Sequence, residues 1–215
     1  MEHKREVRTL PMVELRVVQG ESQKDNCIEG HAAVFDSWSE TLGGIFPFKE
    51  KVVRGAFIDS LKNDDIRALF NHDPNYVLGR NKAGTLELEE DEQGLKVRIN
   101  PPDTQWARDL QTSIARGDIN QMSFGFVVEE DEWRSESEFD VRELRKVKLF
   151  DVSPVTYPAY TATDVGVRAM ESYKEYRTNI ENENKLLKEE QAKKEQEELD
   201  KKRKFEHIKS KFKFM

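Results

Sequence analysis

Two short segments carry residue types that could perform acyl-transfer chemistry. The first, Phe70-Asn71-His72-Asp73-Pro74, places a histidine after an apolar run and beside a carboxylate. The second, Gln121-Met122-Ser123-Phe124-Gly125-Phe126, places a small hydroxyl within a bulky run typical of a strand. A serine at its ordinary pKa is a poor nucleophile, so it needs a base within hydrogen-bond reach and a group that orients this base. His72 and Ser123 could be that base and that nucleophile.

Each of these two residues also has a structural interpretation. His72 could be a polar residue that closes a strand formed by Ala68, Leu69 and Phe70, and from pattern alone this is the favoured interpretation. Ser123 could be a small residue at a place where two elements approach closely. Of the other histidines, His3 and His207 lie in charged terminal segments, while His31 lies in an expected strand.

Other chemistries have less support in the sequence. The nucleophile elbow of α/β-hydrolases needs glycine on both sides of the serine, and Gln121 occupies the first of these positions. The histidines do not form a His-Glu-x-x-His motif, and the single cysteine, Cys27, cannot form a paired-cysteine zinc site or an internal disulfide. Gly43-Gly44 lacks the Lys-Ser/Thr of a phosphate-binding loop. We therefore expect no metal and no cofactor.

A third segment, Leu149 to Tyr160, strengthens the catalytic interpretation. In this order, the three segments resemble the prohead serine proteases of tailed bacteriophages, which are related in fold to the herpesvirus assemblins. The resemblance runs from about Gly30 to Val165. It also includes Gly30-His31-Ala32-Ala33-Val34-Phe35, Val53-Arg54-Gly55-Ala56-Phe57, Leu78-Gly79-Arg80 and Asp91-Glu92-Gln93-Gly94-Leu95.

The resemblance implies that His72 is the base and Ser123 the nucleophile. Relatives hold the third catalytic group on a strand after the serine, and Asp151 is the matching polar residue here, between Phe150 and Val152. A buried carboxylate needs a partner, and orienting His72 would supply one. Asp118 and Asp73 are the alternatives. Asp151 could also form a structural salt bridge, to Arg145 or Lys148.

Strand alternation predicts that Ser123 and Gly125 share one face while Met122, Phe124 and Phe126 point to the other. The two small residues would then line a groove in which an extended peptide binds by strand addition. Arg80 is a candidate for stabilising the oxyanion or the substrate, although it could equally be a surface arginine paired with a carboxylate.

Strand patterns outnumber helical ones in the body of the chain. Expected strands span 13–18, 30–35, 68–70, 85–88, 95–99, 122–128, 144–149 and 151–156, with a turn over 90–94. Helices are expected over 55–63 and 104–116, where apolar residues recur at helical spacing. This pattern predicts a mainly β fold with flanking helices and a small, mostly antiparallel barrel. The resemblance implies a barrel of the assemblin type.

The charge pattern marks a boundary near residue 169. Residues 171–215 contain 13 Lys and Arg against 11 Asp and Glu, so the acidic excess of the chain lies in the body. Residues 172–204 lack Gly and Pro and carry Glu/Lys pairs at helical spacing, which predicts a long exposed helix. We expect a protease domain at 1–168 and a charged helical or disordered tail at 169–215, which could bind a partner.

Composition limits the partners of this protein. The net charge of −7 argues against binding to phosphate backbones, so we expect no nucleic acid. No apolar run approaches the length of a membrane span, and the N-terminal residues do not resemble a secretory signal. We therefore expect no membrane association.

From the resemblance we expect a serine endopeptidase that acts during capsid maturation, in the host cytoplasm inside the immature prohead. Its expected substrates are the scaffold protein, the scaffolding segment of the major capsid protein and its own C-terminal region. Self-association is possible. The alternative is a non-enzymatic assembly or scaffolding protein, with the folded body as a dock and the charged tail as a scaffold.

Overall fold

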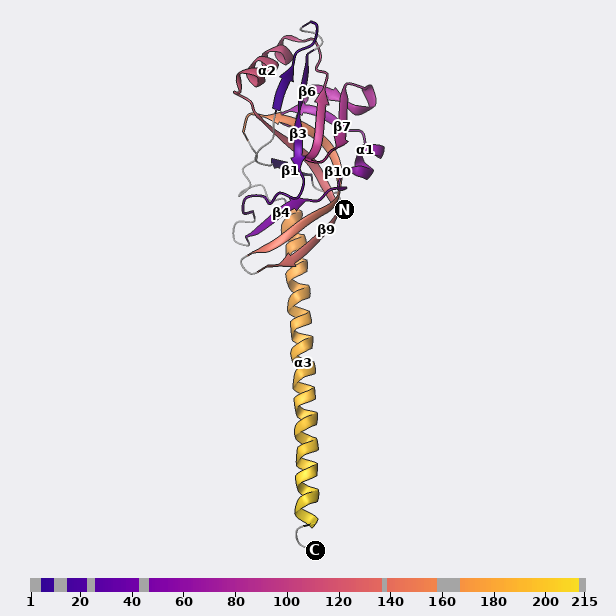
Figure 1. Ribbon diagram of the computed structural model, residues 1–215, viewed down its shortest axis with the longest axis vertical. Coiled ribbons are helices and arrows are strands. Elements are labelled where there is room, and N and C mark those ends of the chain that lie inside the picture. Colours follow the sequence, from indigo (N-terminus) through magenta and orange to yellow (C-terminus); the bar gives the residue numbers. More distant parts are fainter. Residues whose placement is uncertain are drawn as a thin grey trace. The chain divides into compact units, whose positions relative to one another are not determined.

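The computed structural model describes residues 5–9, 15–22, 26–42, 47–136, 139–157 and 167–212. The chain divides into two compact units, Met1–Met170 and Glu171–Met215. The first unit is built mainly from β-strands, and the second is helical (Figure 1). The mainly β character with a long C-terminal helix that we expected is therefore confirmed.

The larger sheet is organised around two long antiparallel strands that lie side by side, β9 and β10 (Figure 1). Its hydrogen-bonded order is β1-β9-β10-β5-β6, and β4 pairs with the other half of β10. The strands span Glu6–Thr9 (β1), Phe48–Val52 (β4), Arg67–Phe70 (β5), Asp73–Arg80 (β6), Gln121–Ser135 (β9) and Asp140–Val155 (β10). Since β4 and β5 run parallel to β10, the sheet is mixed.

The smaller sheet has four antiparallel strands in the order β2-β3-β8-β7. They span Leu15–Val18 (β2), Cys27–Val34 (β3), Leu86–Glu90 (β7) and Gly94–Ile99 (β8). The expected turn joins β7 to β8, where the Asp91 side chain accepts hydrogen bonds from the amides of Gln93 and Gly94. The beginning of the expected strand at 13–18 lies outside the described residues.

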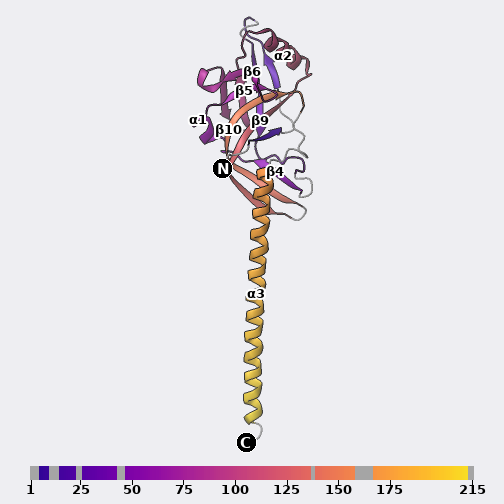
Figure 2. The ribbon, with the colours of Figure 1, turned by 180° about the vertical axis from the view of Figure 1, so that it is seen from behind.

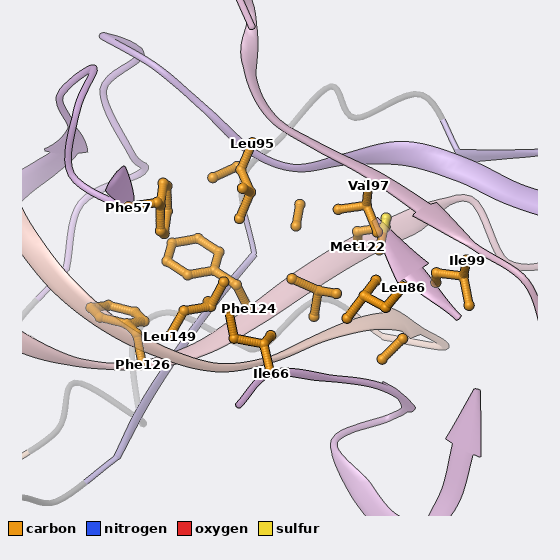
Figure 3. Close-up of a cluster of buried hydrophobic side chains, with 14 of the residues drawn as sticks. Phe57, Ile66, Leu86, Leu95, Val97, Ile99, Met122, Phe124, Phe126 and Leu149 are labelled. Atoms are coloured by element: carbon orange, nitrogen blue, oxygen red, sulfur yellow. The ribbon is translucent and has the colours of Figure 1, made fainter. Parts of the chain in front are cut away.

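The hydrophobic core combines side chains from both sheets (Figure 3). Leu95, Val97 and Ile99 of β8 alternate with exposed residues, as expected for a strand with one buried face. Opposite them, the bulky residues of β9 are fully buried, and the Phe124 ring stacks on Phe126 with a centroid distance of 4.8 Å. The apolar face predicted for β9 is thus the core face.

The helices of the first unit are short. Helix α1 (Ile58–Asn63) packs on β10 (Figures 1 and 2). Helix α2 (Gln105–Arg116) packs on β2, and a 3-10 turn, η2 (Asn81–Ala83), follows β6. Helix α2 ends at Gly117, whose φ of 82° gives the left-handed conformation that glycine adopts without strain. Both helices lie within the ranges predicted from the sequence.

The expected strands at 144–149 and 151–156 form one continuous strand, β10, rather than two. Its pairing with β9 shifts between Leu149 and Asp151, so that Phe150 is the extra residue of a β-bulge. The irregularity that separated the two predicted strands is therefore a bulge and not a turn.

The expected barrel is not confirmed. Among the described residues, the strands pair into two separate sheets, and these pairings do not close either sheet on itself.

The second unit contains most of helix α3, which spans Val167–Phe212. Its described side chains are mostly exposed, including Leu186, Leu187 and Leu199. The predicted long solvated helix is confirmed over the described residues. No helix in the described part of the chain is both long enough and apolar enough to span a membrane.

A buried cluster of charged side chains ties β1 to β4 and β10. The Glu50 carboxylate of β4 accepts hydrogen bonds from Arg8 of β1 and Arg142 of β10, both at 2.8 Å. Arg8 also pairs with Glu6 at 2.7 Å, and Arg142 pairs with Asp131 at 2.6 Å. The two buried arginines depend on their carboxylate partners. Removal of a partner would leave a buried charge uncompensated, which strongly destabilises the fold.

We predict that Glu50→Ala lowers the free energy of unfolding by about 3–5 kcal/mol, since both arginines lose a buried partner. Urea unfolding measures this change. The matched control is Glu89→Ala, which removes an exposed carboxylate paired with Lys96 and should change stability little. Equal effects of the two substitutions would contradict a structural role of the buried cluster.

Candidate active site

Ser123 and Asp151 meet because of the register between β9 and β10. Ser123 lies directly opposite Ser153, and Gly125 lies directly opposite Asp151. Regular alternation would place Asp151 on the same face as Leu149, which is a core residue. The bulge at Phe150 moves Asp151 to the other face, which also carries Ser153 and, on the neighbouring strand, Ser123. One small irregularity thus directs the carboxylate toward the site.

His72 lies in the tight turn between β5 and β6. Phe70 pairs with Asp73, which leaves Asn71 and His72 as a two-residue hairpin loop. Both have positive φ, at 54° and 59°, as a type I′ turn requires. Asparagine and histidine are among the few non-glycine residues enriched in this conformation. Because β5 pairs with β10, this turn lies next to the end of β10, where the imidazole reaches the face that carries Asp151.

The three predicted catalytic residues form a continuous series of contacts. His72 Nδ1 lies 2.5 Å from Asp151 Oδ2, and His72 Nε2 lies 2.8 Å from Ser123 Oγ. Ser123 and Asp151 are both 0% exposed, whereas the His72 side chain is 19% exposed. The structure therefore brings together residues that are 51 and 79 positions apart in the chain.

These contacts determine where the protons lie. An ionised carboxylate can only accept hydrogen bonds, so Nδ1 of His72 carries the hydrogen that is donated to Asp151. In the neutral ring Nε2 is then an acceptor, available for the hydroxyl hydrogen of Ser123. The Arg8 carbonyl oxygen is a second acceptor, also 2.8 Å from Ser123 Oγ. A hydroxyl has one hydrogen, so His72 and the Arg8 carbonyl compete for it.

The pKa of His72 is lowered from 6.5 to about 4, mainly by burial and also by the positive charge of Arg5. The Asp151 carboxylate opposes this change, since an anion favours the imidazolium form. Its other oxygen, however, forms an ion pair with Arg5, which offsets part of its negative charge. The ring is therefore neutral at neutral pH, which is the form a general base needs.

Strand β1 covers the serine. β1 pairs with β9 along the stretch that contains Ser123, with Thr9 opposite Ser123 and Val7 opposite Gly125. A Cβ atom added to Gly125 would collide with Asp151 Oδ1 and would lie 2.7 Å from Nε of Arg5. The predicted open groove at Ser123 and Gly125 is therefore wrong: this chain's own first strand and the Arg5 side chain fill it.

The other sequence candidates make different contacts. Asp118 is exposed and pairs with Arg116 at 3.1 Å, while Asp73 accepts hydrogen bonds from the backbone and side chain of Asn75. The geometry thus selects Asp151 as the partner of His72. Arg80 forms two hydrogen bonds of 2.7 Å to Asp65, which is the surface pairing considered as its alternative. His31 contacts Asp91 at 2.9 Å.

A serine, a neutral histidine and an aspartate in hydrogen-bonded series are the arrangement of a serine hydrolase, in which the histidine activates the serine for attack on an acyl group. Among the described residues, no group of three metal-ligating side chains comes together.

Comparison with known proteins identifies the family to which this chain belongs. The family described as caudovirus prohead serine protease matches residues 12–178, and the chain belongs to this family. The prohead protease of Enterobacteria phage HK97 is 30% identical over 170 residues, which cover 77% of this chain and 69% of the relative. No solved structure matches. The protein is thus a serine peptidase of phage capsid maturation.

Three groups at the site were not predicted from the sequence. Ser153 contacts both Asp151 and His72, and its position two residues after Asp151 on one strand could have indicated a shared face. The Arg8 carbonyl had no comparable signal, because a backbone acceptor is independent of residue type. Arg5 lies in a charged segment that offered no reason to place it beside the carboxylate.

We predict that Gly125→Ala slows peptide cleavage by about 10- to 100-fold, because the new methyl group displaces the buried Asp151 carboxylate from His72. Steady-state kinetics measure the change. Gly84→Ala is an informative comparison: its added Cβ meets nothing within 4 Å, although its φ of 72° makes the substitution strained. A fully active Gly125→Ala enzyme would contradict the close approach described above.

We also predict an acidic pH limit for the reaction. Because protonated His72 cannot accept the serine hydrogen, kcat/KM should fall as the pH drops through about 4, rather than through the ordinary value of 6.5. A pH–rate profile measures this limb. In Arg5→Gln the loss of positive charge raises the pKa of His72, so the limb should move to higher pH. A limb that stays in place in this variant would exclude an influence of Arg5.

Proposed function

We propose that this protein is an endopeptidase that uses Ser123 as nucleophile, His72 as general base and Asp151 as the residue that orients the base. His72 Nε2 takes the hydroxyl hydrogen as Ser123 Oγ attacks a peptide carbonyl. The imidazolium then gives this proton to the leaving amine, which forms an acyl-enzyme. Water, activated by the same imidazole, releases the acyl group and restores the serine.

The observation that carries this proposal is the uninterrupted contact series from Asp151 Oδ2 through the imidazole to Ser123 Oγ. Asp151 fixes the tautomer, so that the free nitrogen faces the serine. It also stabilises the imidazolium that forms during attack, because the ion pair develops in a buried site where charges interact strongly.

The covered hydroxyl sets a condition for this reaction. A peptide carbonyl can reach Ser123 Oγ only after the Arg8 carbonyl leaves it, which requires β1 to shift from the edge of β9. The vacated edge would then offer backbone groups to an extended peptide, which is the strand-addition mode expected from the sequence.

For the biological role, we propose that the substrates are the scaffold protein and the scaffolding segment of the major capsid protein, cleaved inside the prohead in the host cytoplasm. Residues 1–168 would form the protease domain. Residues 169–215 would form an arm that binds the assembling shell and is removed by self-processing. The family membership and the exposed, highly charged surface of α3 support this assignment.

We predict that Ser123→Ala abolishes cleavage of the capsid precursor while leaving the fold intact, because the hydroxyl is the only group removed. Co-expression with the precursor, followed by gel analysis, measures processing, and circular dichroism checks the fold. The control is Ser113→Ala, which removes an exposed hydroxyl of α2 and should leave cleavage unchanged. Cleavage by the Ser123→Ala protein would disprove the assignment of the nucleophile.

A serine-directed fluorophosphonate tests the same assignment against a purely structural assembly role. The reagent should attach to Ser123 in assembled proheads and fail to attach in His72→Ala, where no base is present. Equal labelling of both proteins would contradict base activation by His72.

A further inference from the structure

Ser153 is a buried hydroxyl that the mechanism above does not use. It lies on β10, two residues after Asp151, and it is 0% exposed. Since it is paired directly with Ser123 across the two strands, it belongs to the same face as the nucleophile. A polar side chain in such a place needs hydrogen-bond partners, because burying it without them is costly.

The partners of Ser153 are two of the catalytic residues. Its hydroxyl donates to Asp151 Oδ2 at 2.9 Å, the same oxygen that accepts from His72 Nδ1. The Ser153 oxygen in turn accepts the backbone N–H of His72 at 3.3 Å. The direction of both bonds follows from chemistry, since an ionised carboxylate is only an acceptor and an amide N–H is only a donor.

The backbone around His72 shows why such a contact matters. Asn71 and His72 are held at positive φ, a conformation that residues other than glycine adopt at a cost. β10 holds both of their amides: the Asn71 N–H donates to the Pro154 carbonyl at 3.0 Å, and the His72 N–H donates to Ser153. The Asn71 side chain also exchanges hydrogen bonds with Thr156. The turn is thus fixed at Ser153 and Pro154 near the end of β10 and at Thr156 just after it.

We propose that Ser153 is a positioning residue of the peptidase reaction. Its one hydroxyl holds the Asp151 carboxylate in the orientation that faces His72, and it also anchors the main chain from which the imidazole projects. This inference rests on the proposed catalytic roles of His72, Ser123 and Asp151. It gives the triad a fourth polar group that touches neither substrate nor the reacting atoms.

The test is Ser153→Ala in the full-length chain, assayed for peptide cleavage. A misplaced base acts on the chemical step and not on substrate binding, so kcat should fall about 10- to 100-fold while KM stays within about twofold. The control is Ser60→Ala. Ser60 is also buried, and its hydroxyl likewise donates to a carboxylate, of Asp64, and accepts a backbone N–H of β10, from Leu149.

Ser60→Ala should therefore lower stability to a similar degree and leave kcat unchanged, because its partners lie outside the triad. Urea unfolding of both variants establishes that stability is matched. The proposal is overturned if Ser153→Ala retains the wild-type kcat, or if Ser60→Ala loses as much kcat at the same stability.

Proton NMR provides a readout that does not depend on turnover. The Nδ1 hydrogen shared between His72 and Asp151 should give a downfield resonance in the wild-type protein and in Ser60→Ala, and this resonance should move or disappear in Ser153→Ala. An unchanged resonance in Ser153→Ala would refute the positioning role. If the wild-type protein cleaved no peptide, the proposed function would fail, while the resonance would still test the placement of Asp151 by Ser153.

Discussion

The antiparallel pairing of β9 with β10 is the constraint on which the candidate site depends. This pairing places Ser123 opposite Ser153 and Gly125 opposite Asp151, while the alternate residues of β9 fill the core. Register in a sheet is specified by burial, since a slip of one residue would exchange the two faces. The buried side chains of Phe124 and Phe126 therefore fix the face on which Ser123 lies, although they form no hydrogen bond with it.

Much of the fold could be predicted from the sequence, because its signals are local. Apolar residues alternate in β8 and β9 and recur at helical spacing in α2. Helix α3 is a long, uninterrupted charged stretch. Each of these patterns can be recognised within its own segment of the sequence. The triad was accessible for a different reason. Its three motifs resemble those of a known family, whereas pattern alone favoured a structural role for His72.

The features that escaped prediction depend on tertiary context. The bulge at Phe150 interrupts the alternation of apolar and polar residues, and from the sequence such an interruption looks like the end of a strand. The left-handed turn at Asn71 and His72 lacks the glycine that usually signals such a loop, and contacts with β10 stabilise it instead. For Arg80 the sequence left two roles open, and the structure shows the surface one, a pairing with the Asp65 carboxylate.

β1 joins the buried charge cluster to the candidate active site. The side chain of Arg8 belongs to the buried charge cluster with Glu50, while its carbonyl oxygen contacts the Ser123 hydroxyl. Because β1 is a strand of only four residues, exposing the Ser123 hydroxyl needs only a local opening at the edge of β9, which costs less free energy than unfolding the whole unit.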